Sequence, residues 1–171
     1  RMKKKRAKFR TSLLELGLNQ HYVYRLIMSD AATPHKIEII YQDNGLLVVE
    51  KPSGMMVHRS ADSQPGDVFL LQSLRDQIGQ RVYPIHRLDR PVSGLIVFGT
   101  DPSSAAKLQE ALIQGEKRYL ALVRGCCAAE WEEDKPLTND SGIVQEAKTH
   151  FVSLSSGKYC SLVEARLVTG R

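Results

Sequence analysis

The chain has 171 residues, of which 42% are hydrophobic, enough for one globular domain with a real core. No apolar run approaches the ~20 residues of a membrane-spanning helix, and the charged start lacks the apolar block of a secretory signal, so we expect a cytoplasmic protein with no membrane partner. The three cysteines, Cys126, Cys127 and Cys160, match neither an even disulfide set nor a Cys-x-x-Cys metal site.

The net charge of +5 comes from the first ten residues, which carry seven Lys or Arg and no acid. Removing those seven from the 24 basic residues leaves 17 against 19 acidic residues, a net charge of −2 for the rest of the chain. We therefore predict two parts, a basic N-terminal arm with a short helix at residues 1–35 and one domain at residues 36–171. The arm could contact a polyanion such as RNA, or it could be a solvated tail.

The first predicted elements are a helix and a hairpin. Apolar residues recur every four positions from Thr11 to Met28, which predicts a short helix. Residues 36–41 and 46–49 flank Asp43-Asn44-Gly45, which indicates a β-hairpin. The following Lys51-Pro52-Ser53-Gly54 is interpreted as a fold-shaping turn, after which residues 55–58 are expected to resume the strand.

Two helices are predicted in the middle of the chain. Asp67 is expected to cap the first, which carries Leu70, Leu71, Leu74 and Ile78 on one face and stops at Gly79. Asp101 followed by Pro102 has the order typical of a cap and the first helical residue, and this second helix is expected to end by Gly115.

The carboxy-terminal half is predicted to be mainly strands. Residues 117–124 are apolar on both faces, which favours a central, well-covered strand; residues 130–140 are expected to form a loop. Residues 146–154 and 159–168 predict two long strands joined by a short turn. Because strands come mostly in hairpins with two inserted helices, the class is α+β, with a mixed, largely antiparallel central sheet and flanking helices.

The candidate active-site loop is His86-Arg87-Leu88-Asp89-Arg90-Pro91-Val92-Ser93-Gly94, followed by an apolar strand. Pro91 restricts the backbone, and the strand anchors the loop in the core. Asp89 lies between Arg87 and Arg90 and is expected to stay ionised, since a nearby cation favours the charged form. It would then be a nucleophile or a base. The alternative is an ordinary surface Arg–Asp pair, contributing ~0 to 1 kcal/mol.

An ordered set of blocks resembles the RluA family of pseudouridine synthases, most closely its tRNA-modifying branch, over residues 36–171. The blocks are Ile39-Ile40-Tyr41-Gln42-Asp43 through Lys51-Pro52-Ser53-Gly54 and Val57-His58-Arg59-Ser60, then Arg75-Asp76-Gln77-Ile78-Gly79-Gln80, the loop from His86 to Gly94, Lys117-Arg118-Tyr119 with Val123-Arg124-Gly125, and Thr169-Gly170-Arg171.

The chain departs from the family pattern in three places. Val92 stands where the family usually has Thr, and residues 1–35 match no counterpart in that branch. The family continues its last motif past Thr-Gly-Arg with His-Gln-(Ile/Leu)-Arg, whose final Arg contacts the catalytic Asp. We therefore expect the chain to be the amino-terminal portion of a longer enzyme, with a carboxy-terminally incomplete pseudouridine synthase fold.

The resemblance implies an isomerase that flips a uridine out of RNA, cleaves its N1–C1′ bond and joins C5 to C1′. The implied substrate is tRNA, with uridine 65 as the candidate position, and the implied catalytic residues are Asp89 and Tyr119. Asp89 would attack C1′ or remove the 2′ proton, and Tyr119 would stack on the base near C5. The implied substrate-binding residues are Arg87, which would enter the RNA stack, His86, which would orient the loop, and Arg171.

The reaction oxidises nothing and donates no group, so we expect no cofactor and no metal, and we expect a monomer. Five further basic residues could contact phosphates or be solvated, namely Arg59, Arg90, Lys117, Arg118 and Arg124. Ribosomal RNA is the alternative substrate. A non-catalytic RNA-binding module, in which Asp89 merely pairs with an arginine, is the alternative function. Glycoside hydrolysis ranks last, because it needs a second carboxylate beside Asp89.

Overall fold

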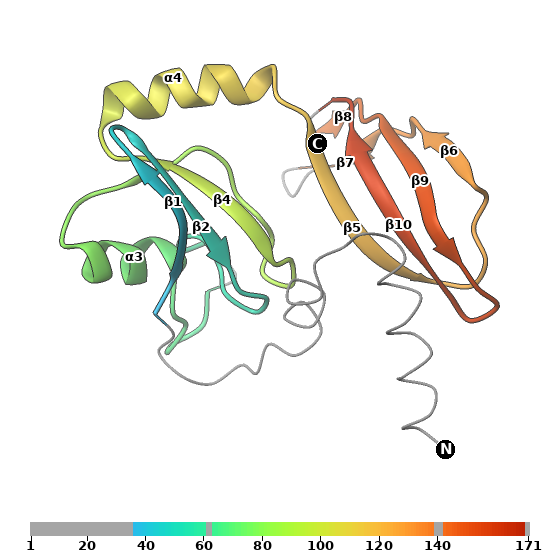
Figure 1. Ribbon diagram of the computed structural model, residues 1–171, viewed down its shortest axis with the longest axis horizontal. Coiled ribbons are helices and arrows are strands. Elements are labelled where there is room, and N and C mark those ends of the chain that lie inside the picture. The colour runs from blue at the N-terminus through green and yellow to red at the C-terminus, as the bar shows by residue number, and fades with distance from the viewer. Residues whose placement is uncertain (1–35, 61–62, 139–141, 170–171) are drawn as a thin grey trace. The chain divides into compact units, whose positions relative to one another are not determined.

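The computed structural model describes residues 36–60, 63–138 and 142–169 (Figure 1). The helix predicted over Thr11–Met28 lies outside these residues. The chain forms two compact units, Arg1–Ala111 and Leu112–Arg171, which are described one after the other. In the ranges that the structure describes, no helix has the length and apolar character needed to cross a bilayer.

The first unit is built on a four-stranded antiparallel sheet in the order β1-β2-β4-β3. Figure 1 labels β1, β2 and β4 of this sheet. Its strands are β1 (Glu38–Asp43), β2 (Leu46–Lys51), β3 (Tyr83–Pro84) and β4 (Gly94–Gly99). The predicted hairpin is confirmed, with Asp43 opposite Leu46 and Gly45 at a φ of +87° in the connecting turn. That positive φ explains the glycine, since a side chain would be strained there.

The core of the first unit lies on one face of this sheet. Strand β2 alternates, so that Leu47, Val49 and Lys51 are fully buried while their neighbours are partly exposed. Helix α3 (Leu70–Ile78) adds Leu70 and Leu74, and β4 adds apolar side chains of its own. Each fully buried apolar side chain stabilises the fold by roughly 1.5–3 kcal/mol. The loop between β3 and β4 therefore starts and ends on a well-packed base.

The predicted start of the second helix is confirmed, whereas the predicted N-cap of the first helix is wrong. Helix α4 (Pro102–Ile113) begins as predicted, with the Ser104 N–H donating to Asp101 Oδ1 at 2.9 Å. Helix α3 ends at Gly79 as predicted, but its N-cap residue is Phe69 and no side chain caps it. The interpretation of Asp67 as a cap is wrong, because its carboxylate binds Arg90 and the Gln64 N–H instead.

The segment after the 51–54 turn is also not the expected strand. Within residues 55–58, only Met56 forms a β-bridge, an isolated parallel one to Phe69. The Leu70 and Leu71 N–H groups donate to the carbonyls of Met56 and Val57 at 2.9 and 3.0 Å. These carbonyls therefore pair with the start of α3 and not with a strand.

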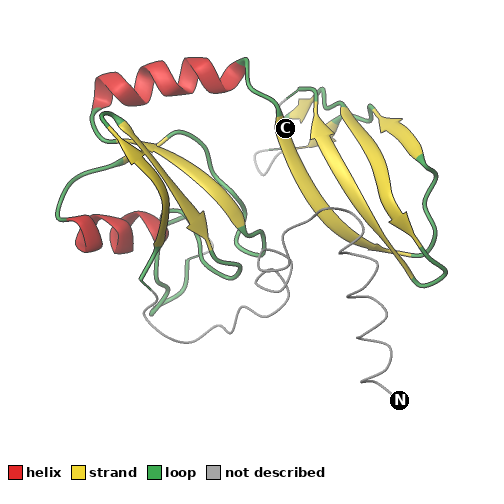
Figure 2. Ribbon diagram, viewed as in Figure 1, coloured by secondary structure: helices red, strands yellow, loops and turns green. Residues whose placement is uncertain are grey.

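The second unit is a four-stranded antiparallel sheet in the order β5-β10-β9-β6. Its strands are β5 (Lys117–Arg124), β6 (Glu130–Glu133), β9 (Thr149–Ser156) and β10 (Cys160–Leu167), and a separate pair is formed by β7 (Leu137–Thr138) and β8 (Val144–Gln145). Figure 2 shows that the described residues after α4 form only strands, loops and turns. The two long strands predicted near the end of the chain are confirmed.

Two expectations for the second unit are wrong. Strand β5 is at the edge of its sheet, not at the centre, and Leu122 is 62% exposed. Strands β6 and β7 both lie in the stretch of residues 130–140 that was expected to be a loop. Strand β6 forms because its residues find cross-strand partners. Glu130 lies 2.6 Å from His150, and Trp131 stacks on Phe151 with the ring centroids 4.9 Å apart. The α+β class with antiparallel sheets is nevertheless confirmed.

Candidate active site

The loop between β3 and β4 presents Asp89 at the surface. Leu88 is 9% exposed, whereas the side chains of its neighbours Arg87 and Asp89 are 62% and 75% exposed. The Val92 N–H donates to the Asp89 carbonyl at 3.0 Å and closes a turn. The buried leucine thus anchors the loop while the carboxylate beside it faces outward, where it can act on an external molecule as a nucleophile or a base.

His86 fastens the start of this loop to β4. Its Nε2 accepts a hydrogen bond from the Val97 N–H at 3.2 Å, and the Ile85 N–H donates to the Val97 carbonyl at 3.0 Å. Both contacts go to one residue on the neighbouring strand. These two bonds attach the start of the loop to β4, and the role of His86 in substrate binding stays a prediction.

Lys51 holds the other side of the loop from inside the core. Its ammonium group donates to the carbonyls of Met55, Pro52 and Arg90 at 2.6, 3.0 and 3.4 Å. Burial lowers the pKa of Lys51 to about 8, and the negative charge of Asp89 acts in the opposite direction. This residue was not among the predicted site residues. The alternation of β2, which places position 51 on the buried face, was the signal that could have found it.

The rest of the 51–54 turn is bonded to the loop as well. The Gly54 N–H donates to the Arg90 carbonyl at 2.7 Å, and the Ser53 hydroxyl donates to the Pro91 carbonyl at 2.8 Å. The turn that was interpreted as fold-shaping is therefore hydrogen-bonded to the backbone on the carboxy-terminal side of Asp89.

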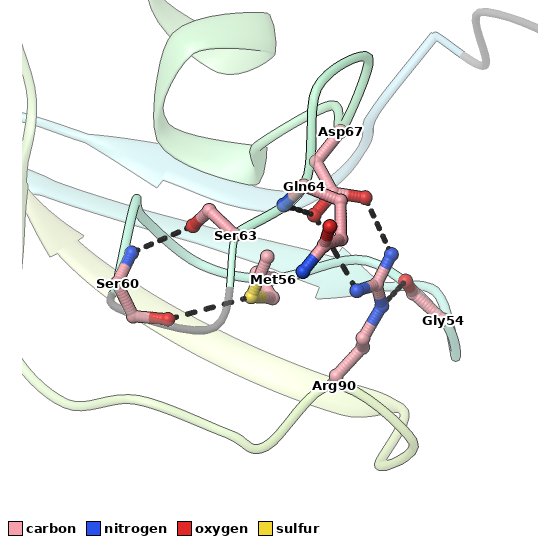
Figure 3. Close-up of polar contacts among 7 residues, drawn as sticks. All are labelled: Gly54, Met56, Ser60, Ser63, Gln64, Asp67 and Arg90. Carbon is pink, nitrogen blue, oxygen red and sulfur yellow. Dashed lines mark hydrogen bonds and ion pairs between the residues drawn. The ribbon is translucent and has the colours of Figure 1, made fainter.

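Arg90 pairs with Asp67 and not with Asp89, so the expectation that both flanking arginines act on the Asp89 carboxylate is wrong. The Arg90 guanidinium binds Asp67, with Nη2 at 2.6 Å from Oδ1 and Nη1 at 3.4 Å from Oδ2 (Figure 3). This two-pronged geometry is the preferred one for an arginine and a carboxylate. The Arg87 guanidinium does lie near Asp89, with Nη2 at 3.8 Å from Oδ1.

The predicted site residues do not all lie in one unit. His86, Arg87 and Asp89 lie together in the first unit. Tyr119 lies on β5 of the second unit, half-buried and opposite Ala165 of β10. Arg171 lies outside the described residues. The placement of Tyr119 beside Asp89 therefore stays a prediction.

Three of the five candidate phosphate ligands already have protein contacts. Arg90 binds Asp67, the Arg118 guanidinium lies 2.6 Å from Glu116, and the Arg59 guanidinium lies 5.7 Å from the centre of the Phe69 ring. Among the residues that the structure describes, no three His, Cys, Asp or Glu side chains are grouped so that they could hold a metal ion.

Comparison with known proteins identifies relatives with similar sequences. The chain is 39% identical over 159 residues to tRNA pseudouridine synthase C of Haemophilus ducreyi, covering 80% of this chain and 65% of that protein. It is 42% identical over 139 residues to tRNA pseudouridine synthase C of Pasteurella multocida, covering 72% of this chain and 57% of that protein. The chain thus spans about three fifths of the length of these relatives.

Solved structures and a family model agree with the relatives. Human RNA Pseudouridylate Synthase Domain Containing 4 superposes with a TM-score of 0.65 at 26% identity, covering 78% of this chain and 60% of that one. Human RNA Pseudouridylate Synthase Domain Containing 1, at 20% identity and a TM-score of 0.68 over 84% of this chain and 64% of that one, shares the fold. The model of the family described as RNA pseudouridylate synthase matches residues 45–171, which include the Asp89 loop and β5. The chain therefore belongs to the RNA pseudouridylate synthase family.

Proposed function

We propose that the protein is an RNA pseudouridine synthase that converts a specific uridine of tRNA into pseudouridine, with Asp89 as the catalytic residue. The observation that carries the proposal is the Asp89 loop itself. Its carboxylate is 75% exposed, while the backbone around it is bonded to β4 and to the 51–54 turn. Membership of the family gives the reaction, and the names of the relatives favour tRNA over ribosomal RNA.

The reaction is an isomerisation, so atoms and electrons balance without a cofactor or metal. The N1–C1′ bond breaks, the uracil rotates, and C5 bonds to C1′. The hydrogen on C5 leaves and N1 gains one. An ionised Asp89 can start this sequence by attacking C1′ or by removing the 2′ proton, and either route needs an exposed carboxylate held in a fixed position.

The other predicted residues receive roles around this step. Arg87 is loosely paired, at 3.8 Å from Asp89, and can leave that contact to fill the space of the flipped base. Such a contact offsets part of the few kcal/mol that unstacking costs. His86 orients the loop, Tyr119 stacks on the base near C5, and Arg171 binds substrate. A cytoplasmic location follows from the proposed tRNA substrate.

The test measures release of tritium from tRNA that carries [5-³H]uridine. We expect release by the full-length wild-type protein and none by its Asp89→Asn variant, while both bind tRNA equally in a gel-shift assay. Asp101→Asn is the matched control, because it makes the same chemical change at a helix cap in the same part of the chain. Release by Asp89→Asn at the wild-type rate would refute the assignment.

A second experiment identifies the RNA. Pseudouridines are mapped in cells with and without the gene, and we expect a site in tRNA to disappear. Loss of a site from ribosomal RNA instead would make that RNA the substrate. Salt-sensitive binding without any modified uridine would favour a non-catalytic RNA-binding module.

A further inference from the structure

Asp67 is held in position by a tight turn. The sequence Gln64-Pro65-Gly66-Asp67 places proline second and glycine third, the arrangement of a type II turn, and Gly66 has the positive φ, +90°, that this turn requires. The Asp67 N–H donates to the Gln64 carbonyl at 3.1 Å, and the Gln64 N–H donates to Asp67 Oδ2 at 2.8 Å. The turn thus holds the Asp67 carboxylate in place independently of Arg90.

This fixed carboxylate receives the Arg90 guanidinium (Figure 3). The Asp67 side chain is 11% exposed, and both of its oxygens contact Arg90, at 2.6 and 3.4 Å. The third donor of the guanidinium, Nε, reaches the Gly54 carbonyl at 3.2 Å. The N–H of Gly54 and the carbonyl of Arg90 are joined in return at 2.7 Å, so Arg90 is held through both its side chain and its backbone.

The contact matters because Arg90 directly follows Asp89. An arginine in that position, released from Asp67, would be a mobile cation next to an exposed carboxylate. It could then cover the carboxylate that the reaction needs, and the backbone that carries Asp89 would lose one of its attachments. In the structure, the guanidinium lies on the Asp67 carboxylate instead.

We propose that Asp67 is a positioning residue for the reaction: by holding the Arg90 guanidinium, it fixes the backbone beside Asp89 and keeps this cation off the Asp89 carboxylate. The proposal rests on the proposed synthase function. A merely structural ion pair at this surface would change stability slightly and leave the rate of the chemical step alone.

The first experiment measures the loop directly, without any activity. Amide hydrogen exchange of Gly54 and Val92 is followed by NMR in the wild type and in the Asp67→Asn, Arg90→Met and Asp101→Asn variants. Gly54 donates to the Arg90 carbonyl and Val92 to the Asp89 carbonyl. We expect faster exchange at both amides in Asp67→Asn and Arg90→Met, and wild-type exchange in Asp101→Asn.

The second experiment measures kcat and KM for tritium release by the same variants and by the Asp67→Asn, Arg90→Met double variant. We expect Asp67→Asn to lower kcat by up to roughly 100-fold, the scale of a 1 Å misplacement, with KM unchanged. If Asp67 acts through Arg90, then adding Asp67→Asn to Arg90→Met lowers kcat no further.

The two experiments test separate parts of the proposal. Wild-type exchange in Asp67→Asn overturns the proposal even if no variant is active. Faster exchange with an unchanged kcat overturns the role in the reaction, and additive losses in the double variant overturn the action through Arg90. If the full-length wild-type protein releases no tritium from any RNA, the proposed function fails and the role in the reaction fails with it, whereas the exchange rates still decide whether Asp67 holds the loop.

Discussion

Replacing Lys51 with methionine should change how the stability of the protein depends on pH. Lys51 is fully buried, and burial lowers its pKa from 10.5 to about 8, against the opposing influence of Asp89. In the unfolded chain the same group keeps the higher pKa, so the unfolded state binds more protons between pH 8 and 10.5. The buried charge therefore opposes folding fully below pH 8, and this penalty disappears as the pH rises to 10.5.

The size of the effect follows from the two pKa values. At about 1.4 kcal/mol per pH unit, the interval from about 8 to 10.5 corresponds to ~3 kcal/mol. Methionine at position 51 removes this penalty, but it also leaves the Pro52 and Met55 carbonyls without the Lys51 donor, at a cost of about 1–3 kcal/mol for each group left unsatisfied. The Arg90 carbonyl still accepts a hydrogen bond from the Gly54 N–H. The pH dependence separates the two effects, since only the first depends on the proton.

The assay is urea unfolding of the wild type and Lys51→Met at several values between pH 7 and 10.5, with Lys107→Met, an exposed lysine on α4, as the control. We expect the free energy of unfolding of the wild type to rise relative to Lys51→Met by ~3 kcal/mol over this range. The difference between the wild type and Lys107→Met should stay constant. A constant difference for Lys51→Met too would refute the reasoning.

Lys51 is electrostatically coupled to the proposed catalytic residue. Asp89 raises the pKa of Lys51, in opposition to burial. Asp89→Asn should therefore lower the pKa of Lys51 further, which the chemical shift of its Cε measures by NMR. An unchanged pKa would mean that the carboxylate does not act on this ammonium group.

Two further predictions concern helix α4. Gly99→Ala should lower the free energy of unfolding, measured in urea, by about 1–3 kcal/mol, because a Cβ there would lie 2.6 Å from the backbone nitrogen and Cα of Ala105. Adding Ala105→Gly should not restore the stability, since the clash is with the backbone. Full recovery in the double variant would contradict this explanation. Asp101→Ala should lower the Tm, chiefly near neutral pH. Hydrogen bonds from Ser104 lower the pKa of Asp101, so its contribution is present above the unfolded pKa and is lost as the pH falls through the folded value. Equal losses of Tm at neutral and acidic pH would contradict this.

Several elements could be predicted because their signals are local. Asp43-Asn44-Gly45 predicted the hairpin, since a tight turn needs a residue that tolerates a positive φ. Asp101-Pro102 predicted the start of α4 in the same way. Strand β6 was missed because its cross-strand partners, such as His150, lie about 20 residues away and cannot be read from the acidic stretch itself.

The candidate site was predicted in part for the same reason. Asp89 and its loop were identified from a short motif. The partner of Arg90 was not, because Asp67 lies 23 residues away and Asp89 is adjacent in sequence. Asp67 also fitted a helix cap locally, and the structure uses it for the longer-range contact. The position of Tyr119 relative to Asp89 stays a prediction.

By itself, the sequence determined the family, the candidate carboxylate and those elements whose ends depend on a few neighbouring residues. Only the tertiary structure decided that Arg90 pairs with Asp67 and that Lys51 is buried beneath the loop. The physical reason is the separation in sequence between the residues that interact. A turn or a cap is favoured by the conformations and hydrogen bonds of adjacent residues. The partner of a charge and its exposure to water depend instead on which distant segments the fold brings together.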